Sequence, residues 1–289
     1  MVEQRKCYLC GSDEFTIVHH GVRGAKDIDV LKCQNCGLVR LSKFISNTDE
    51  FYADSGMRDG QITTIKEIRA EANADDHRRF EMTKENLVNK KVLDFGCGAG
   101  GYLHKAKKVA KEVSGVELEQ AMREELIKEG IICFPDIKEA AAKLDRVDII
   151  TLWHVLEHLE DPISMLKQLK EKLELNGKIY IEVPNADDAL LSLYENKNFA
   201  DFTYWRCHLY LYTNKTLREV IEKAGLRVSF VTQIQRYPLS NTLYWLAKGK
   251  PGGHVKWSSL NDETLRHCWE NKLAGLGIAD TIVAIAEMQ

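Results

Sequence analysis

Four cysteines near the start of the chain have the spacing of a metal site. Cys7 and Cys10 form one CxxC pair, Cys33 and Cys36 form a second, and a glycine follows each pair. Each pair can bring two thiolates to one side of a tight turn, and four thiolates make the tetrahedral ligand set that zinc favours. Because four protein ligands leave no position open for catalysis, we expect a structural zinc ion that folds a small zinc-ribbon module over residues 1–45.

A run of glycines after an apolar segment is the second feature that predicts chemistry. Residues 91–101 read KVLDFGCGAGG. This pattern is typical of a buried parallel strand that turns into a helix whose N-terminus faces a ligand. Gly96, Gly98 and Gly101 also fit the dinucleotide fingerprint, with an acid, Glu117, about 20 residues further on. The glycines alone therefore leave the kind of nucleotide ligand open.

Histidines provide a third set of candidate residues. The segment His154-Val-Leu-Glu157-His158 fits HxxEH, the inverted motif of zinc peptidases. If this segment is helical, His154 and His158 share one face. The segment follows a predicted strand, so it lies at the carboxyl edge where open α/β sheets bind their ligands. A second histidine-containing stretch has His208 among the aromatic residues Tyr204, Trp205, Tyr210 and Tyr212.

Alternating strand and helix patterns must position these residues. Repeated βα units with nearly continuous apolar strands predict a mostly parallel α/β sheet that is covered on both faces. One helix should end at Gly130, a second should begin at Asp161-Pro162, and a third should run over residues 213–224 before Gly225. The expected strands are residues 92–95, 113–118, 131–134, 147–153, 178–183, 226–234 and 281–286.

The chain divides into three predicted parts. The four-cysteine module (residues 1–45) is followed by a helical connector (46–90), in which Phe51 and Tyr52 could form a lid. The main domain covers residues 91–289. Between its last two strands, residues 235–280 form an excursion too long to be a simple loop, so we expect a cap over the substrate there.

Composition and charge limit the class of protein. The chain has 289 residues, of which 44% are hydrophobic and 29% charged, with a net charge of −3 and a pI of about 6.3. A slightly acidic chain of this kind gives no support to a nucleic-acid partner. No signal peptide is readable, and no run of about 18 apolar residues would form a spanning helix, so we expect a cytoplasmic protein without membrane attachment. The oligomeric state is not predicted.

Several segments together resemble one family. They are Asp94-Phe-Gly96-Cys97-Gly98-Ala-Gly100, Val-Glu117-Leu118, Asp136-Ile137, residues 148–162, residues 176–178 and residues 208–220. With these segments the chain resembles a class I S-adenosylmethionine (SAM)-dependent methyltransferase of the methyltransferase-23-like type, with a four-cysteine zinc module as in sugar and polysaccharide pathways. The resemblance implies a Rossmann-like, doubly wound sheet of seven strands with an antiparallel last strand.

Asp94 favours SAM over a dinucleotide. SAM carries an ammonium and a sulfonium where a dinucleotide carries pyrophosphate, so a carboxylate beside the loop attracts the first and repels the second. The resemblance places Glu117 at the ribose hydroxyls and Asp136 at the adenine amino group, although Asp136 also fits a helix N-cap. The full set expected around the cofactor is Asp94, Gly96, Cys97, Gly98, Gly100, Glu117, Leu118, Asp136, Ile137 and Trp153.

The acceptor side of the site is predicted from the histidines. Members of the resembled subfamily carry the HxxEH letters without metal, so we expect His154 or His158 to accept a proton from the acceptor, with His208 toward the substrate. The alternative is that His154 only shapes the SAM pocket and that His158 packs. The resemblance favours O-methylation of a small molecule or a sugar or surface-glycan precursor. Two alternatives are an rRNA or tRNA methyltransferase whose zinc module binds RNA, and a sugar C-methyltransferase.

Overall fold

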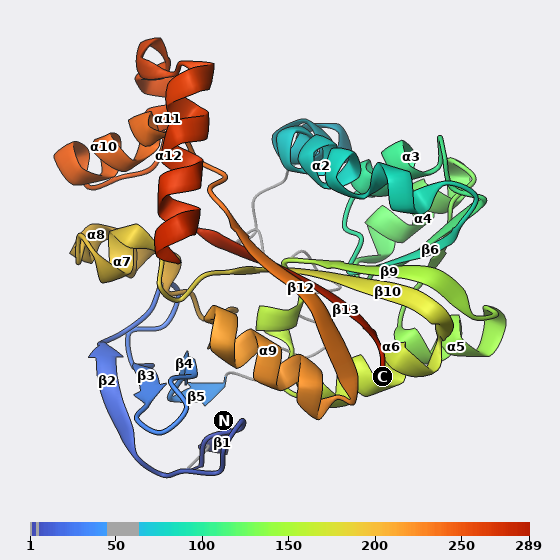
Figure 1. Ribbon diagram of the computed structural model, residues 1–289, viewed down its shortest axis with the longest axis horizontal. Helices are drawn as coiled ribbons and strands as arrows, with labels where there is room; N and C mark the ends of the chain where they lie inside the picture. The colour runs from blue at the N-terminus through green and yellow to red at the C-terminus, as the bar shows by residue number, and fades with distance from the viewer. Residues whose placement is uncertain (1, 4–5, 45–63) are drawn as a thin grey trace.

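A seven-stranded sheet forms the centre of the computed structural model, which describes residues 2–3, 6–44 and 64–289 (Figure 1). Its strands are β6 (Lys91–Phe95), β7 (Glu112–Val116), β8 (Ile132–Phe134), β9 (Val147–Trp153), β10 (Leu173–Pro184), β12 (Leu226–Ile234) and β13 (Thr281–Met288). In space they follow the order β12-β13-β10-β9-β6-β7-β8. The strands from β10 to β8 are parallel, whereas β13 pairs antiparallel with β10 and β12. This arrangement confirms the predicted Rossmann-like sheet with its antiparallel last strand.

Helices cover both faces of this sheet (Figure 1). On one face lie α2 (Ile65–Leu87), α3 (Gly101–Ala106) and α4 (Gln120–Lys128), and on the other α5 (Ile137–Lys143), α6 (Pro162–Glu171) and α9 (Asn214–Lys223). Two covered faces explain why β9 reads as an almost continuous apolar run, with Asp148 as its one residue that is not fully buried. In the described parts of the chain, no helix is long and apolar enough to cross a membrane.

The predicted helix ends are found where the sequence signals lie. Asp161 caps α6 by accepting a hydrogen bond from the backbone N–H of Ser164, and Pro162 occupies the first helical position. Gly130 follows α4 with a left-handed φ of 72°, and Gly225 follows α9 with a φ of 77°. These positions favour glycine because it has no Cβ to clash in the left-handed region.

Helix α2 forms most of the described connector, and its buried face is largely polar. The buried side chains are Asp76, Arg79, Thr83 and Leu87. A polar face can be buried here because it lies against charged and polar partners, which are described below. The proposed lid residues Phe51 and Tyr52 lie outside the described residues.

The N-terminal module shares a sheet with the main domain. Strands β2 (Phe15–His19), β3 (Val30–Cys33) and β4 (Val39–Leu41) form a four-stranded sheet with β11 (Tyr210–Leu211), which belongs to the later part of the chain. A small pair of strands, β1 (Val2–Glu3) and β5 (Lys43–Phe44), completes the module. One hydrophobic cluster runs from Leu9 and Leu41 in the module to Leu209 in the main domain. The core is therefore continuous between the two parts.

The excursion between β12 and β13 is helical. It contains α10 (Leu239–Lys248), α11 (Gly253–Lys256), the 3₁₀ turn η3 (Ser258–Leu260) and α12 (Glu263–Leu276). In Figure 1 these orange and red helices rise above α7 (Ala189–Ser192) and α8 (Lys197–Thr203), beyond one end of the sheet.

Candidate active site

The glycine loop between β6 and α3 passes under helix α2. A Cβ added to Gly101 would lie 2.1 Å from Asp76 Oδ2 on α2, so only glycine permits this close approach. Gly98 has a left-handed φ of 52°, and no atom lies within 4 Å of the place where its Cβ would be. The backbone at Gly98 therefore faces open space, as a loop that receives a ligand requires.

Asp94 lies directly before this loop and is buried, with 2% of its surface exposed. Strand register places Asp94 beside Thr151 on β9, whose hydroxyl donates a 2.6 Å hydrogen bond to Asp94 Oδ1. Burial raises the pKa of Asp94 to about 7, although the Thr151 hydrogen bond and the charge of Arg79 lower it. A cation brought beside this carboxyl group would favour its ionised form.

Glu117 closes the loop from the end of β7. Its Oε2 accepts a 2.7 Å hydrogen bond from the Gly98 N–H, and its Oε1 accepts a 2.9 Å bond from the Glu119 N–H. Burial raises the pKa of Glu117, and these two hydrogen bonds oppose the rise. Leu118 is half-buried, and its carbonyl accepts a hydrogen bond from Arg123. An ionised carboxylate has about four acceptor positions, so Glu117 retains capacity for ligand hydroxyls.

The other expected cofactor residues have different surroundings. Asp136 is exposed and caps α5, where its Oδ1 accepts a 2.8 Å hydrogen bond from the Glu139 N–H, which confirms the N-cap alternative. Ile137 is buried in the core. The Cys97 thiol points toward Cys133, with 3.7 Å between the two sulfur atoms. Trp153 ends β9 with its ring 5.3 Å from that of Tyr102, and its indole Nε1 is buried without a hydrogen-bond partner.

His154 and His158 do not share a helical face, so that expectation is wrong. His154 has a left-handed φ of 56°, and only a 3₁₀ turn, η2 (Leu156–His158), follows it. The His154 N–H continues the sheet ladder by donating to the Glu182 carbonyl at 2.8 Å. The next α-helix, α6, begins only at Pro162.

The His154 imidazole lies between two carboxylates. Its Nδ1 is 3.1 Å from Glu157 Oε1 and its Nε2 is 3.2 Å from Glu182 Oε1. Burial opposes the charged form, but these two hydrogen bonds outweigh it and raise the pKa of His154. The charge of Arg236, whose Nη1 lies 3.2 Å from His154 Nε2, opposes this rise in the pKa.

His158 and His208 form a second histidine group on the other side of Glu157. The His158 Nδ1–H donates to the Cys207 carbonyl at 2.8 Å, and its Nε2 lies 3.9 Å from Glu157 Oε1. The rings of His158 and His208 are 5.0 Å apart. Burial lowers the pKa of His158 and lowers that of His208 to about 3, so both imidazoles are neutral.

Two buried atoms of this group have no hydrogen-bond partner among the residues that the structure describes. They are Oε2 of Glu157, a fully buried residue, and Nδ1 of His208. Burial opposes ionisation of Glu157, but the hydrogen bond with His154 and the charge of that imidazole keep the pKa of Glu157 lowered. Ligand atoms of Glu157, His158 and His208 lie within 4.8 Å of one another. The group is thus arranged to bind a polar ligand.

A buried carboxylate that the sequence analysis did not single out joins this site to helix α2. Glu182 on β10 is fully buried and accepts hydrogen bonds from Arg78 at 2.9 Å and Arg79 at 2.7 Å. Burial opposes its ionisation, but the His154 hydrogen bond and the nearby arginines hold its pKa well below the usual range. Its sequence signal was a single acid within the apolar run IYIEV of residues 179–183.

Arg236 was also missed by the sequence analysis. It follows β12, forms an ion pair with Asp75 on α2, and places its Nη1 3.2 Å from His154 Nε2. No local pattern distinguishes Arg236 from an exposed loop arginine, because its partners come from distant parts of the chain.

A cavity of about 750 Å³ opens in front of the histidines. Helix α2, the end of β9, residues 199–208 and helix α10 all contribute to its walls. Among the aromatic residues predicted near His208, Trp205 lines the cavity, whereas Tyr210 and Tyr212 are fully buried in the core. Side chains that line the cavity include Arg79, Trp153, His154, His158, Phe202, Trp205, His208, Arg236 and Trp245.

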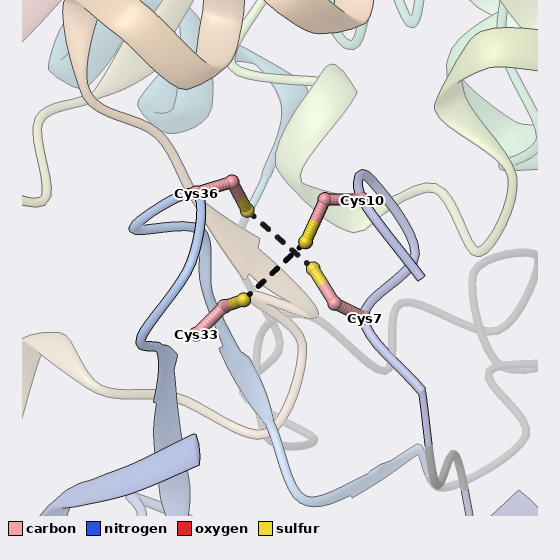
Figure 2. A group of neighbouring side chains, drawn as sticks. All are labelled: Cys7, Cys10, Cys33 and Cys36. Carbon is pink, nitrogen blue, oxygen red and sulfur yellow. Dashed lines mark hydrogen bonds between the residues drawn. The ribbon is translucent and has the colours of Figure 1, made fainter. Parts of the chain in front are cut away.

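The four N-terminal cysteines converge. Figure 2 shows their side chains pointing toward a common centre from the two CxxC turns. Sγ of Cys7 is 3.6 Å from that of Cys36, and Sγ of Cys10 is 3.5 Å from that of Cys33. A tetrahedron with Zn–S bonds of about 2.3 Å has edges of about 3.8 Å. The cysteine geometry therefore fits a closed zinc site.

Comparison with known proteins gives a family match. A model of the family described as "Methyltransferase domain" matches residues 65–229. Curated relatives include ubiquinone biosynthesis O-methyltransferases of Haemophilus ducreyi, 26% identical over 37% of this chain and 50% of the relative, and of Histophilus somni, 29% identical over the same shares. The chain thus spans about half the length of these two relatives. The Coxiella burnetii protein of the same description is 26% identical over 54% of this chain and 71% of its own.

Solved structures also resemble the chain. A SAM-dependent methyltransferase from Archaeoglobus fulgidus is 20% identical, covers 77% of this chain and 94% of its own, and has a TM-score of 0.48. A magnesium protoporphyrin IX methyltransferase from Synechocystis, solved with bound SAH, is 14% identical, covers 83% of this chain and 98% of its own, and has a TM-score of 0.49.

Proposed function

Because this chain belongs to the methyltransferase domain family, we propose that it transfers a methyl group from SAM to a hydroxyl of a small molecule. The observation that carries the proposal is the buried Asp94 at the glycine loop. Its carboxyl group has a pKa of about 7, and a bound cation there would favour the ionised form. The ammonium and sulfonium of SAM provide such positive charge, whereas the pyrophosphate of a dinucleotide would be repelled.

The residues around the loop fit the remaining parts of SAM. The Gly98 backbone faces open space, and Glu117 retains acceptor capacity for two ribose hydroxyls. Leu118, Asp136 and Ile137 follow the neighbouring strands, and the family resemblance places adenine there. When bound, SAM supplies a methyl group attached to a positively charged sulfur. This sulfur is a good leaving group without being protonated.

His158 is the proposed general base. It is neutral, its Nδ1–H is held by the Cys207 carbonyl, and its Nε2 is therefore the basic nitrogen. Nε2 would accept the proton of the acceptor hydroxyl, and the Glu157 carboxylate at 3.9 Å would stabilise the resulting imidazolium, while bound SAM would supply the methyl group as its sulfur–methyl bond breaks. His154 is unsuited to this role because both of its nitrogens contact carboxylates. His208, with a pKa of about 3, is a weak base and is assigned to acceptor binding.

The cavity supports a ring-bearing, hydroxylated acceptor. Its walls include Phe202, Trp205 and Trp245, and aromatic faces pack well against sugar or aromatic rings. The proposed substrates are therefore a small molecule or a sugar or glycan precursor. The four-cysteine cluster is proposed to hold a structural zinc ion, which leaves no ligand position for catalysis.

Calorimetric titration of SAM tests the cofactor site. We expect Asp94→Asn to weaken SAM binding about 10- to 100-fold, because a charge-assisted interaction of about 1.5–3 kcal/mol is lost. Asp148→Asn is the matched control, since Asp148 begins the neighbouring strand at the opposite edge and bonds to Lys90 and Lys91. Equal SAM affinity in the wild type and Asp94→Asn would refute the proposed site.

Transfer of a tritiated methyl group from SAM tests the acceptor class. Fractionated metabolites and RNA are assayed side by side with the wild type and with His158→Gln. Label in a small-molecule fraction that is lost in His158→Gln supports the proposal. Label only in RNA, or attached to carbon, would replace it with one of the alternative methyltransferase activities.

A further inference from the structure

Strand β4 of the four-cysteine module pairs directly with the segment that carries His208. Arg40 and Val39 on β4 are opposite Tyr210 and Leu211 on β11. The Leu41 N–H donates to the Leu209 carbonyl at 3.1 Å, and the Leu209 N–H in turn donates to the Glu157 carbonyl at 2.8 Å. Residues 209–211, directly after His208, are thus hydrogen-bonded between the module and the turn that carries Glu157.

Arg23 makes a second connection to the same segment. Its N–H donates to the Tyr204 carbonyl at 2.8 Å, and its carbonyl accepts from the Arg206 N–H at 3.1 Å. Its guanidinium lies 4.7 Å from the ring centre of Trp205 and 4.8 Å from that of Phe202. Both rings line the cavity, so a module residue stacks behind two of the cavity walls.

The cysteine cluster includes two residues at the turn that leads from β3 into β4. Cys33 ends β3, and its N–H donates to the Leu38 carbonyl at 2.9 Å, directly before β4 begins. Cys36 belongs to the turn between these two strands. A metal ion bound by Cys33 and Cys36 would therefore fix the β3–β4 turn and with it the edge that holds β11.

We propose that the four-cysteine module supports the acceptor-cavity wall that Phe202 and Trp205 form, with Arg23 as a positioning residue for Trp205 and with metal binding at the cysteines fixing residues 204–211. The assignment of this cavity to the acceptor rests on the proposed function. The glycine loop is anchored elsewhere, since the Gly96 and Cys97 N–H groups donate to the Val116 carbonyl on β7, so metal loss should leave cofactor binding intact.

Hydrogen exchange with and without metal tests this coupling, and it requires neither acceptor nor activity. The zinc-loaded full-length chain is compared with the chelated chain by mass spectrometry. We expect residues 204–211 to exchange about tenfold faster or more without zinc, and residues 92–117 to be unchanged. Unchanged exchange at residues 204–211 after zinc loss would overturn the proposal. The result is independent of whether methyl transfer is detected, so it separates this inference from the proposed function.

A variant that leaves the cysteines intact provides a second test. With zinc bound, Arg23→Ala should speed exchange at residues 204–211 while its affinity for SAH stays at the wild-type value. Lys32→Ala is the control, because Lys32 is exposed on β3 and removes the same charge from the module. If chelation unfolds the whole chain, the Arg23→Ala comparison decides alone: wild-type exchange at residues 204–211 would overturn the role of Arg23.

Discussion

Two histidines four positions apart have opposite protonation preferences because their neighbours differ. His154 lies between the carboxylates of Glu157 and Glu182, which raise its pKa despite burial. His158 lies beside the Cys207 carbonyl and the neutral His208, and burial lowers its pKa. Proton acceptance requires a neutral imidazole. Under the proposed function, this requirement favours His158 as the base and leaves an electrostatic role to His154.

Replacing the proposed base should slow turnover without weakening cofactor binding. We expect His158→Gln to reduce kcat about 10²- to 10⁴-fold, the usual contribution of a general base, while the SAH dissociation constant is retained. The measurement is steady-state methyl transfer together with calorimetric SAH titration. His267→Gln, on the exposed surface of α12, is the control. Wild-type kcat in His158→Gln would exclude His158 as the base.

Cofactor affinity should depend on pH through Asp94. Its pKa of about 7 lies above the usual value, so the carboxyl group is protonated below pH 7 and ionised above it. Only the ionised form attracts SAM, so lowering the pH from about 8 to about 6 should weaken binding about tenfold. Calorimetry at several pH values measures this. Asp94→Asn should show weak binding with little pH dependence, and a pH-independent wild type would contradict the assignment.

At the scale of elements, the site is built where β10 meets α2. Strand β10 contributes Glu182, and α2 contributes Arg78 and Arg79 from its buried polar face. The same carboxylate contacts His154 at the end of β9. One buried acid thus fixes a helix over the glycine loop and orients a residue of the cavity.

Removing this acid should destabilise the fold. Glu182→Gln leaves two arginines in a buried position without their carboxylate, which typically costs about 3–5 kcal/mol of unfolding free energy. Denaturant unfolding measures the loss. Glu174→Gln, on an exposed part of the same strand, should change stability by less than about 0.5 kcal/mol. A difference between the two variants below about 1 kcal/mol would show that the network does not hold α2 in place.

The acid stability of the chain should reflect the same residue. The folded-state pKa of Glu182 lies well below its unfolded value, so its contribution is fully present above the unfolded pKa and is lost as the pH falls through the folded pKa. Unfolding free energy measured from about pH 6 downward should therefore fall less steeply in Glu182→Gln than in the wild type. Parallel curves would contradict this.

At the scale of the whole molecule, the module and the main domain form one packed unit. The hydrophobic cluster that contains Leu9 and Leu41 also contains Leu209 and Leu152. The four-stranded sheet takes β11 from the main domain. Tyr8, between the first two cysteines, accepts a 2.9 Å hydrogen bond from the Ile163 N–H at the start of α6. A continuous core of this kind favours cooperative unfolding.

Calorimetry should therefore show a single unfolding transition that depends on metal. We expect Cys36→Ser, or a chelator, to lower the Tm of that one transition by about 4 °C or more, because a binding free energy that contributes to folding is lost. Cys268→Ser, at an exposed cysteine on α12, should leave the Tm unchanged. Two separate transitions in the zinc-loaded wild type would show that the module and the main domain unfold independently.

The sequence determined those features that depend on residues close together in the chain. Periodicity and the end signals at Pro162 and Gly225 predicted the strands, the helices and the sheet, because burial patterns and backbone preferences are local. Two CxxC pairs predicted the cysteine cluster for the same reason. The glycine loop and Asp94 could be found because these proposed cofactor-binding residues belong to one strand and its following turn.

Tertiary structure decided which charged groups meet. Glu182, Arg79 and Arg236 are distant in sequence, and only the packing of α2 across β10 and the end of β12 brings them to His154. Because a pKa depends on burial and on neighbouring charge, the sequence could identify His154 and His158 as candidates without distinguishing their roles. The contact between the module and the segment that follows His208 likewise depends on strand pairing between β4 and β11, a long-range match that no local pattern specifies.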